Sequence, residues 1–152
     1  MYEKKDKLHI VAVTAVIRRG GKYLLLKRRP NEIAYPSMYV FPGGKIEGND
    51  TVEETLAKEV KEEASLRLKP GKMLLKDRTF IRPDGRTAKV FSYLCEAEGS
   101  VKISEDFTEY KWVSMEDLKN IKHVGIEEGI RKAEQLLALG NLDLLKTKSE
   151  KA

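Results

Sequence analysis

The 152-residue chain has a single cysteine and only two histidines. One cysteine cannot form an intramolecular disulfide, and Cys95 falls in a strand-like run, so we expect a buried thiol in a reducing compartment. Neither His9 nor His123 has a second histidine within metal-ligand spacing. The sequence therefore gives no indication of a disulfide or of a histidine-based metal site.

Long apolar runs are also missing. No stretch reaches the ~18 apolar residues of a membrane helix, and residues 1–20 lack the apolar core and cleavage site of a signal peptide. The formal net charge is +5, but much of the excess lies in residues 4–7 and 146–148. No basic helix alternates with aromatic residues. We therefore expect a cytoplasmic protein that binds neither nucleic acid nor a membrane.

The length of the chain suits one domain with one core. There is no internal repeat, low-complexity tract or interdomain linker, so residues 1–152 are expected to form a single domain. Its ends, about 1–6 and 147–152, are expected to be flexible. The sequence does not distinguish a monomer from a homodimer.

Several runs predict β-strands. Leu8–Arg18 is rich in β-branched residues and is followed by Gly20-Gly21 and a second apolar run, which predicts a hairpin. Met73–Ile81 and Thr87–Glu96 flank Asp84-Gly85 and predict another hairpin. Short strands are also expected at residues 39–41 and 110–113, with an acidic loop at residues 105–109.

Two helices are predicted. The first begins near Asp50 or Thr51, because both residues are followed three positions later by a glutamate, as in a capping box. Its apolar stripe consists of Val52, Leu56 and Val60, with Ala57 and Ala64 beside it. The second spans Ile126–Leu139 and ends at Gly140.

The glycine loop Phe41–Lys45 precedes the first helix, on which Glu59, Glu62 and Glu63 fall within an arc of roughly 100°. On the helix alone, a solvated acidic face is the favoured interpretation. The glycine loop favours a site, because glycine lets an ion or ligand approach the backbone closely. Clustered carboxylates supply the hard oxygen ligands of divalent cations, which bind and polarise phosphates. We interpret the segment as a metal-dependent pyrophosphate-cleaving site.

The segment resembles the Nudix hydrolase signature, which reads Gly, five residues, Glu, seven residues, Arg-Glu, an aliphatic residue, any residue, Glu-Glu, any residue, Gly and an aliphatic residue. The corresponding residues are Gly44, Asp50, Lys58-Glu59, Val60, Glu62-Glu63, Ser65 and Leu66. Asp50, Lys58 and Ser65 depart from the pattern. The resemblance implies the α/β (α+β) class, with an α/β/α sandwich around a central mixed β-sheet.

The resemblance also implies Mg²⁺- or Mn²⁺-dependent hydrolysis of a nucleoside diphosphate linked to another group. The implied metal ligands are the Gly43 carbonyl, Glu59, Glu62 and Glu63, completed by Asp106 or Glu105 in preference to Glu109. Glu59 is the first choice for the general base among the catalytic residues Glu59, Glu62 and Glu63. The expected substrate contacts are Arg28, Arg29, Gly44 and Lys45, with Asp50 and Lys58 in supporting positions.

The favoured substrate is a (deoxy)nucleoside triphosphate, cleaved to the monophosphate and pyrophosphate. Pro83 lies 17 residues after Leu66, which keeps hydrolysis of ADP-ribose or a related nucleotide sugar open. A dinucleoside polyphosphate ranks third, because no tyrosine lies at that distance. A non-catalytic nucleotide-binding module is the alternative of another class, and the intact helix glutamates argue against it.

Overall fold

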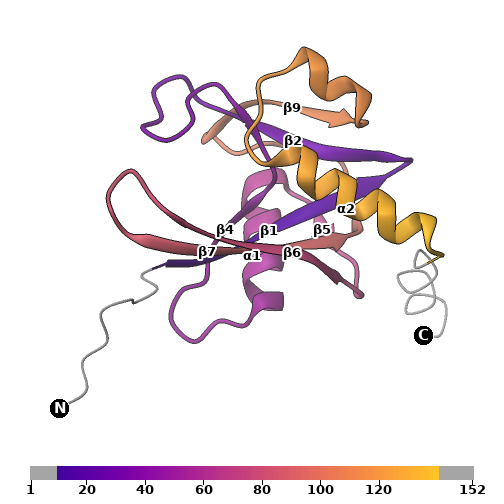
Figure 1. Cartoon of the computed structure of the whole chain (residues 1–152), viewed down its shortest axis with the longest axis horizontal. Helices are drawn as coiled ribbons and strands as arrows, with labels where there is room; N and C mark the ends of the chain where they lie inside the picture. Colours follow the sequence, from indigo (N-terminus) through magenta and orange to yellow (C-terminus); the bar gives the residue numbers. More distant parts are fainter. Residues whose placement is uncertain (1–9, 141–152) are drawn as a thin grey trace.

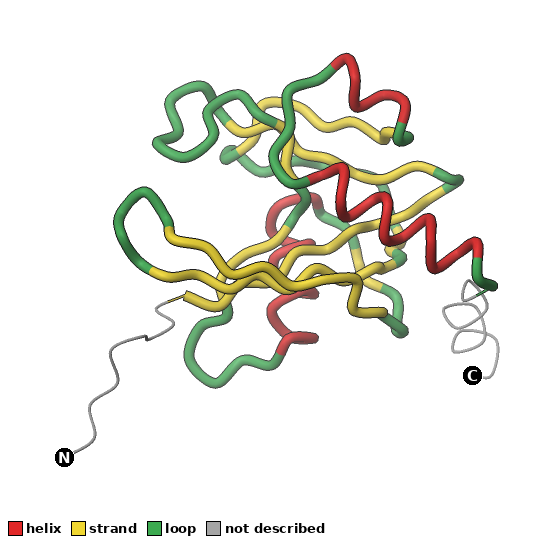
Figure 2. The backbone as a smooth tube through the Cα atoms, in the orientation of Figure 1, coloured by secondary structure: helices red, strands yellow, loops and turns green. Residues whose placement is uncertain are grey.

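The computed structural model describes residues 10–140. The predicted flexible ends, residues 1–6 and 147–152, lie outside this range. The elements are β1 (Ile10–Arg19), β2 (Lys22–Arg28), β3 (Tyr39–Val40), β4 (Gly43–Lys45), α1 (Val52–Ala64), β5 (Arg67–Leu68), β6 (Met73–Ile81), β7 (Thr87–Cys95), β8 (Ala97–Glu98), β9 (Phe107–Val113), the 3₁₀ helix η1 (Glu116–Asn120) and α2 (Ile126–Ala138). Figure 2 shows these strands between the two α-helices.

The main sheet has the strand order β3-β2-β1-β7-β6, with β4 added to β1 and β9 added to β2. β1 and β7 are parallel and the other pairs are antiparallel, so the sheet is mixed, as expected. β1 pairs with β2 only at Arg18 and Arg19. The two groups of strands on either side of this contact therefore diverge (Figure 1).

Both predicted hairpins are confirmed, but the boundary of the acidic loop was wrong. Residues 107–109 belong to β9 and pair with β2. The reason is that Phe107 is buried, at 6% exposure, and begins the strand from inside the core. The loop before β9 therefore ends at Asp106.

The two α-helices cover opposite faces of the sheet (Figure 1). Side chains alternate between faces along a strand. Val13, Ala15 and Ile17 of β1 accordingly join a buried cluster with Leu56, Val60 and Ala64 of α1. Val16 joins a second cluster with Ile126, Ile130 and Ala133 of α2.

One detail of the predicted α1 stripe was wrong. Ala57 is exposed and Thr55 is buried instead. Thr55 tolerates burial because its hydroxyl donates a hydrogen bond to the Thr51 carbonyl at 2.9 Å. Cys95 is buried as expected, and burial raises the pKa of its thiol to about 12. Between residues 10 and 140, no helix has the length and apolar character needed to span a bilayer.

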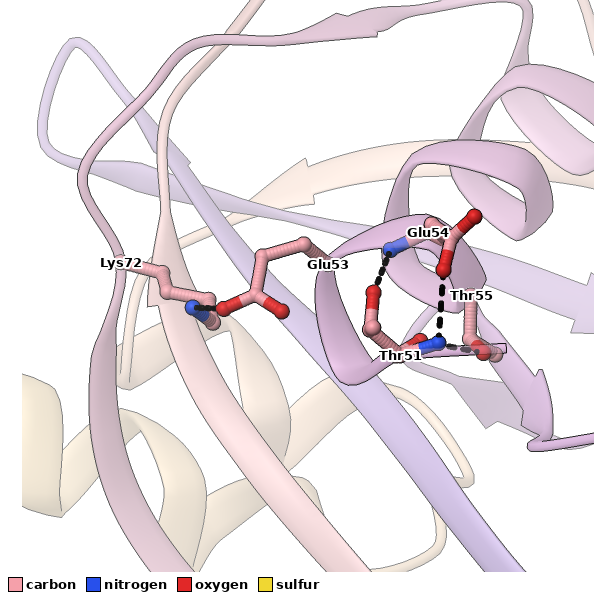
Figure 3. A network of polar contacts seen from close by, with 5 residues as sticks. All are labelled: Thr51, Glu53, Glu54, Thr55 and Lys72. Carbon is pink, nitrogen blue, oxygen red and sulfur yellow. Dashed lines mark hydrogen bonds and ion pairs between the residues drawn. The ribbon is translucent and has the colours of Figure 1, made fainter. Parts of the chain in front are cut away.

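The start of α1 resolves the two capping alternatives in favour of Thr51 (Figure 3). Its hydroxyl accepts from the Glu54 amide at 3.1 Å, and the Glu54 carboxylate accepts from the Thr51 amide at 2.9 Å. Glu53 adds an ion pair with Lys72, which ties the first turn to the segment before β6.

Replacing this cap should cost a measurable part of the stability. Thr51→Ala is expected to lower the free energy of unfolding by about 1 kcal/mol, because the first-turn amide loses its acceptor. Urea denaturation measures the change, and Asp50→Ala, at the rejected start, is the matched control. An equal loss in both variants would contradict the assignment of the cap.

Part of the second sheet face is left without a helix. Ala12 and Thr14 share this face with Val16, but they line cavities instead of packing against α2. The side chains of β1, β7 and β6 that α2 does not cover therefore form the floor of the region next to the glycine loop.

Candidate active site

The structure brings the glycine loop against two of the three helix glutamates. β4 pairs with β1, which places Gly43 opposite Thr14 and Gly44 opposite Val13. The Gly43 amide donates a hydrogen bond to Glu63 Oε1 at 2.9 Å. A Cβ atom at Gly44 would lie 2.5 Å from the carboxyl carbon of Glu59. The two carboxylates therefore lie directly against the loop, with no space for a side chain between Gly44 and Glu59.

Glu62 and the loop acids occupy different positions. Glu62 is exposed, yet its charge adds to the effect of burial in raising the pKa of the Glu59 carboxyl. The loop before β9 is held to the end of α1, because the amides of Lys102 and Ser104 donate to the carbonyls of Ala64 and Glu63 at 3.0 and 3.1 Å. These bonds bring Asp106 close enough to Glu63 to raise its pKa.

The other two loop acids contribute less to this cluster. Glu109 lies in β9, where its carboxylate accepts a hydrogen bond from the Tyr39 hydroxyl. Glu105 is exposed, and its backbone carbonyl accepts from Arg29 Nε. Among the loop acids, Asp106 is therefore the one whose charge reaches the half-buried Glu63.

Burial and mutual repulsion disfavour the ionised forms of the carboxyl groups in this cluster. Burial raises the pKa of Glu63 to about 8, and the charges of Glu59 and Asp106 add to this effect, while the Gly43 amide opposes it. Burial also raises the pKa of Glu59, helped by Glu62 and Glu47 and opposed by Lys58. Glu47 was not predicted as a site residue, although its position two residues after the glycine loop was a usable signal.

The residues present fit a divalent cation in donor type and in charge. All the candidate side chains offer carboxylate oxygens, the ligands that Mg²⁺ and Mn²⁺ prefer. The raised pKa values reflect desolvated negative charge that a cation would compensate. In the described range, no three acidic, histidine or cysteine side chains already converge on one point. The side chains would therefore have to rotate toward an ion; the candidates are Glu59, Glu62, Glu63 and Asp106.

The raised pKa of Glu63 predicts how the metal-free protein responds to pH. The folded-state pKa of Glu63, about 8, exceeds the ordinary value of 4.5. The contribution of this carboxyl to the stability of the fold is therefore complete below pH 4.5 and is lost as the pH rises through 8. The melting temperature in a chelator should fall between pH 5 and 8 by several degrees.

Thermal melts in this window measure the effect, and Glu63→Gln should flatten the curve because its amide does not titrate. Added Mg²⁺ should restore the melting temperature at pH 8. A wild-type curve that is as flat as that of the variant would contradict the burial of an ionisable carboxyl at this position.

The basic end of β2 faces the same region. Arg28 Nε donates to the Ala34 carbonyl at 2.7 Å, and the guanidinium pairs with Glu32 at 3.2 Å. The charge of Arg28 opposes the rise that burial causes in the pKa of Glu63, so the two side chains are within electrostatic range. Arg29 instead anchors the backbone of Glu105, a positioning contact that the sequence did not indicate.

A cavity of about 560 Å³ opens beside the glycine loop. Its wall includes Arg28, Gly44, Lys45, Tyr35, Phe80 and Pro83. The first three were predicted substrate contacts, and the structure places them around one space. Tyr35 and Phe80 were missed, because only the tertiary fold brings the loop before β3 next to the β6–β7 hairpin.

The NUDIX domain family model matches residues 8–133. The chain belongs to the NUDIX family. It is similar to the nucleoside triphosphatase NudI of Klebsiella pneumoniae (strain 342), with 33% identity over 71% of this chain and 84% of that protein. NudI of Escherichia coli O139:H28 (strain E24377A / ETEC) is 31% identical over 84% of this chain and 95% of that protein.

A solved structure has the same fold. The MutT NUDIX hydrolase of Burkholderia pseudomallei superposes with a TM-score of 0.72 and 23% identity, covering 81% of this chain and 96% of that one. The expected Nudix architecture of a mixed sheet and two helices is thus confirmed.

The Nudix signature departs from its usual form at Ser65, and the structure supplies a compensation. Ser65 ends α1 in the left-handed region, with φ 61° and ψ 25°, where a residue with a Cβ is strained. Its hydroxyl donates to the Lys102 carbonyl at 3.0 Å. This bond, which glycine would lack, helps to hold the segment that leads to Asp106.

Proposed function

We propose that this Nudix protein is a Mg²⁺- or Mn²⁺-dependent pyrophosphohydrolase that converts a (deoxy)nucleoside triphosphate to the monophosphate and pyrophosphate. The observation that carries the proposal is the position of the Glu59 and Glu63 carboxylates against Gly43 and Gly44, beside the cavity with Arg28 and Lys45. The activity named for the NudI relatives supports the same substrate class.

Each residue has a role in this proposal. The carboxylates of Glu59, Glu62, Glu63 and Asp106, with the Gly43 carbonyl, would hold the cations. Bound cations would offset phosphate charge and lower the pKa of an attacking water. Glu59 is assigned to accept the proton of that water, because its carboxylate lies against Gly44 beside the cavity. Arg28 and Lys45 bind phosphate oxygens from the cavity side.

Three further residues support this arrangement. Lys58 balances part of the charge around Glu59. The Asp50 amide donates to the Glu47 carbonyl at 3.1 Å, which closes the turn between the glycine loop and α1. Arg29 binds the backbone of Glu105 and so holds the loop that carries Glu105 and Asp106. The Glu105 carboxylate is the alternative loop ligand to Asp106.

The proposal is tested by incubating the protein with Mg²⁺ and nucleoside triphosphates, ADP-ribose or diadenosine tetraphosphate, and separating the products by chromatography. Monophosphate and pyrophosphate are expected from the triphosphates. Glu62→Gln should be inactive, and Glu127→Gln on the exposed side of α2 should match the wild type. The absence of turnover with every substrate, together with unchanged ligand binding in Glu62→Gln, would rule out the catalytic function.

Hydrolysis of ADP-ribose is the second candidate. Pro83, the residue that kept this alternative open, lines the same cavity as Arg28 and Lys45. The substrate panel separates the two, because ADP-ribose would yield AMP and ribose 5-phosphate.

A further inference from the structure

Three strands present a row of polar side chains on the sheet face that α2 leaves open. The strand register places Thr14 of β1 beside Ser92 of β7, and Ser92 beside Lys76 of β6. Arg78 lies two residues after Lys76 and so faces the same side. The hydroxyls of Thr14 and Ser92 hydrogen bond to each other at 2.8 Å.

These residues line a second cavity of about 210 Å³, which shares Tyr35, Phe80 and Val90 with the larger one. Gly44 and Lys45 of the glycine loop line the larger cavity, and the second cavity continues from it toward the start of α2. Its size suits a flat ring better than a whole nucleoside. A nucleotide with its phosphates at Gly44 can therefore extend its base across the shared wall.

The polar lining of this second cavity is dominated by hydrogen-bond donors. None of the described residues that line it has a carboxylate or amide side chain. Lysine and arginine are donors only. Val124 and Gly125, which precede α2, also line the cavity and carry no side-chain acceptor.

The chemistry of the bases then distinguishes two groups. The base is joined to the sugar at one edge. When the base enters a cavity from the sugar side, the opposite edge lies deepest in the cavity. At that edge, guanine and thymine carry carbonyl acceptors, whereas adenine and cytosine carry amino donors. Uracil has the same carbonyl as thymine. An amino group facing Lys76 and Arg78 would meet two side chains that only donate.

On the basis of the proposed function, we propose that the second cavity holds the nucleobase and that Lys76 and Arg78 select bases with a carbonyl at this edge: guanine, uracil and thymine. The neighbouring surfaces favour a base over a phosphate group. Phe41 and Phe80 supply flat apolar walls, and the Arg78 guanidinium stacks on the Phe80 ring at 5.0 Å.

The test compares kcat/KM for dGTP, dTTP, dUTP, dATP and dCTP. We expect the three substrates with carbonyl bases to exceed the two with amino bases by about tenfold or more, because a base held against donors that it cannot pair with loses hydrogen bonds that the carbonyl bases make. Lys76→Met and Arg78→Met should reduce this ratio. Lys89→Met is the matched control, since Lys89 lies on the opposite face of the same hairpin and pairs with Asp77.

A binding measurement tests the base preference independently of hydrolysis. Binding of dTMP and dAMP, titrated without metal, should show the same preference in the wild type and lose it in Arg78→Met. Equal kcat/KM for all bases, or a uniform loss for all substrates in both variants, would overturn the inference. If no triphosphate is hydrolysed, the proposed function fails, and the ratio of dTMP to dAMP affinity still decides the inference.

Discussion

Glu63→Gln is expected to lower kcat by on the order of 10²–10³-fold while the protein remains folded. The glutamine Oε1 can still accept the hydrogen bond that the Gly43 amide donates to Glu63 at 2.9 Å. The substitution therefore keeps the shape of the site and removes one negative charge. Without that charge the cluster loses part of its capacity to hold divalent cations.

Initial rates at saturating Mg²⁺ and a thermal melt in a chelator check both parts of this expectation. Glu127→Gln removes a carboxylate from the exposed side of α2 and should change neither result. Collapse of the fold in Glu63→Gln would show a structural role, and an unchanged kcat would remove Glu63 from the proposed catalytic group.

Substitutions of the two loop glycines should separate stability from activity. A Cβ atom at Gly43 would lie 2.2 Å from the Val13 carbonyl oxygen and 2.8 Å from the Thr14 Cα atom. Both atoms are backbone of β1, which pairs with three other strands. Gly43→Ala should therefore force β4 away from β1 and cost about 3 kcal/mol of unfolding free energy.

In Gly44→Ala, the new Cβ atom would contact the end of a side chain instead of the backbone. The new Cβ would displace the Glu59 carboxylate, whose oxygens lie at 2.7 and 2.8 Å. A glutamate can rotate away, so we expect the fold to survive and activity to fall by on the order of 10²-fold through a displaced catalytic group.

Urea denaturation and initial rates measured on both variants test the pair of expectations. Each alanine is the control for the other, since the two glycines are neighbours on the same short strand. A stable, active Gly43→Ala variant would contradict the close approach of β4 to β1. A fully active Gly44→Ala variant would mean that Glu59 does not act from its observed position.

Local patterns were sufficient for much of the architecture. The glycine turn after residue 18 and the Asp84-Gly85 turn predicted both hairpins, because short turns restrict which strands can pair. The capping-box spacing predicted the start of α1 to within one residue, and the helical period placed the three glutamates along one edge. The Nudix signature indicated the family from the same short segment, despite the differences at Asp50, Lys58 and Ser65.

Contacts between distant segments required the folded chain. Whether Glu59, Glu62 or Glu63 meets the glycine loop depends on how β4 pairs with β1, and Asp106 reaches Glu63 only because residues 102–104 bind the end of α1. The row of Thr14, Ser92 and Lys76 joins three strands and stays open because α2 covers only part of that face. Sequence periodicity determines which side chains share a face of one element, whereas strand register and helix packing determine which elements meet.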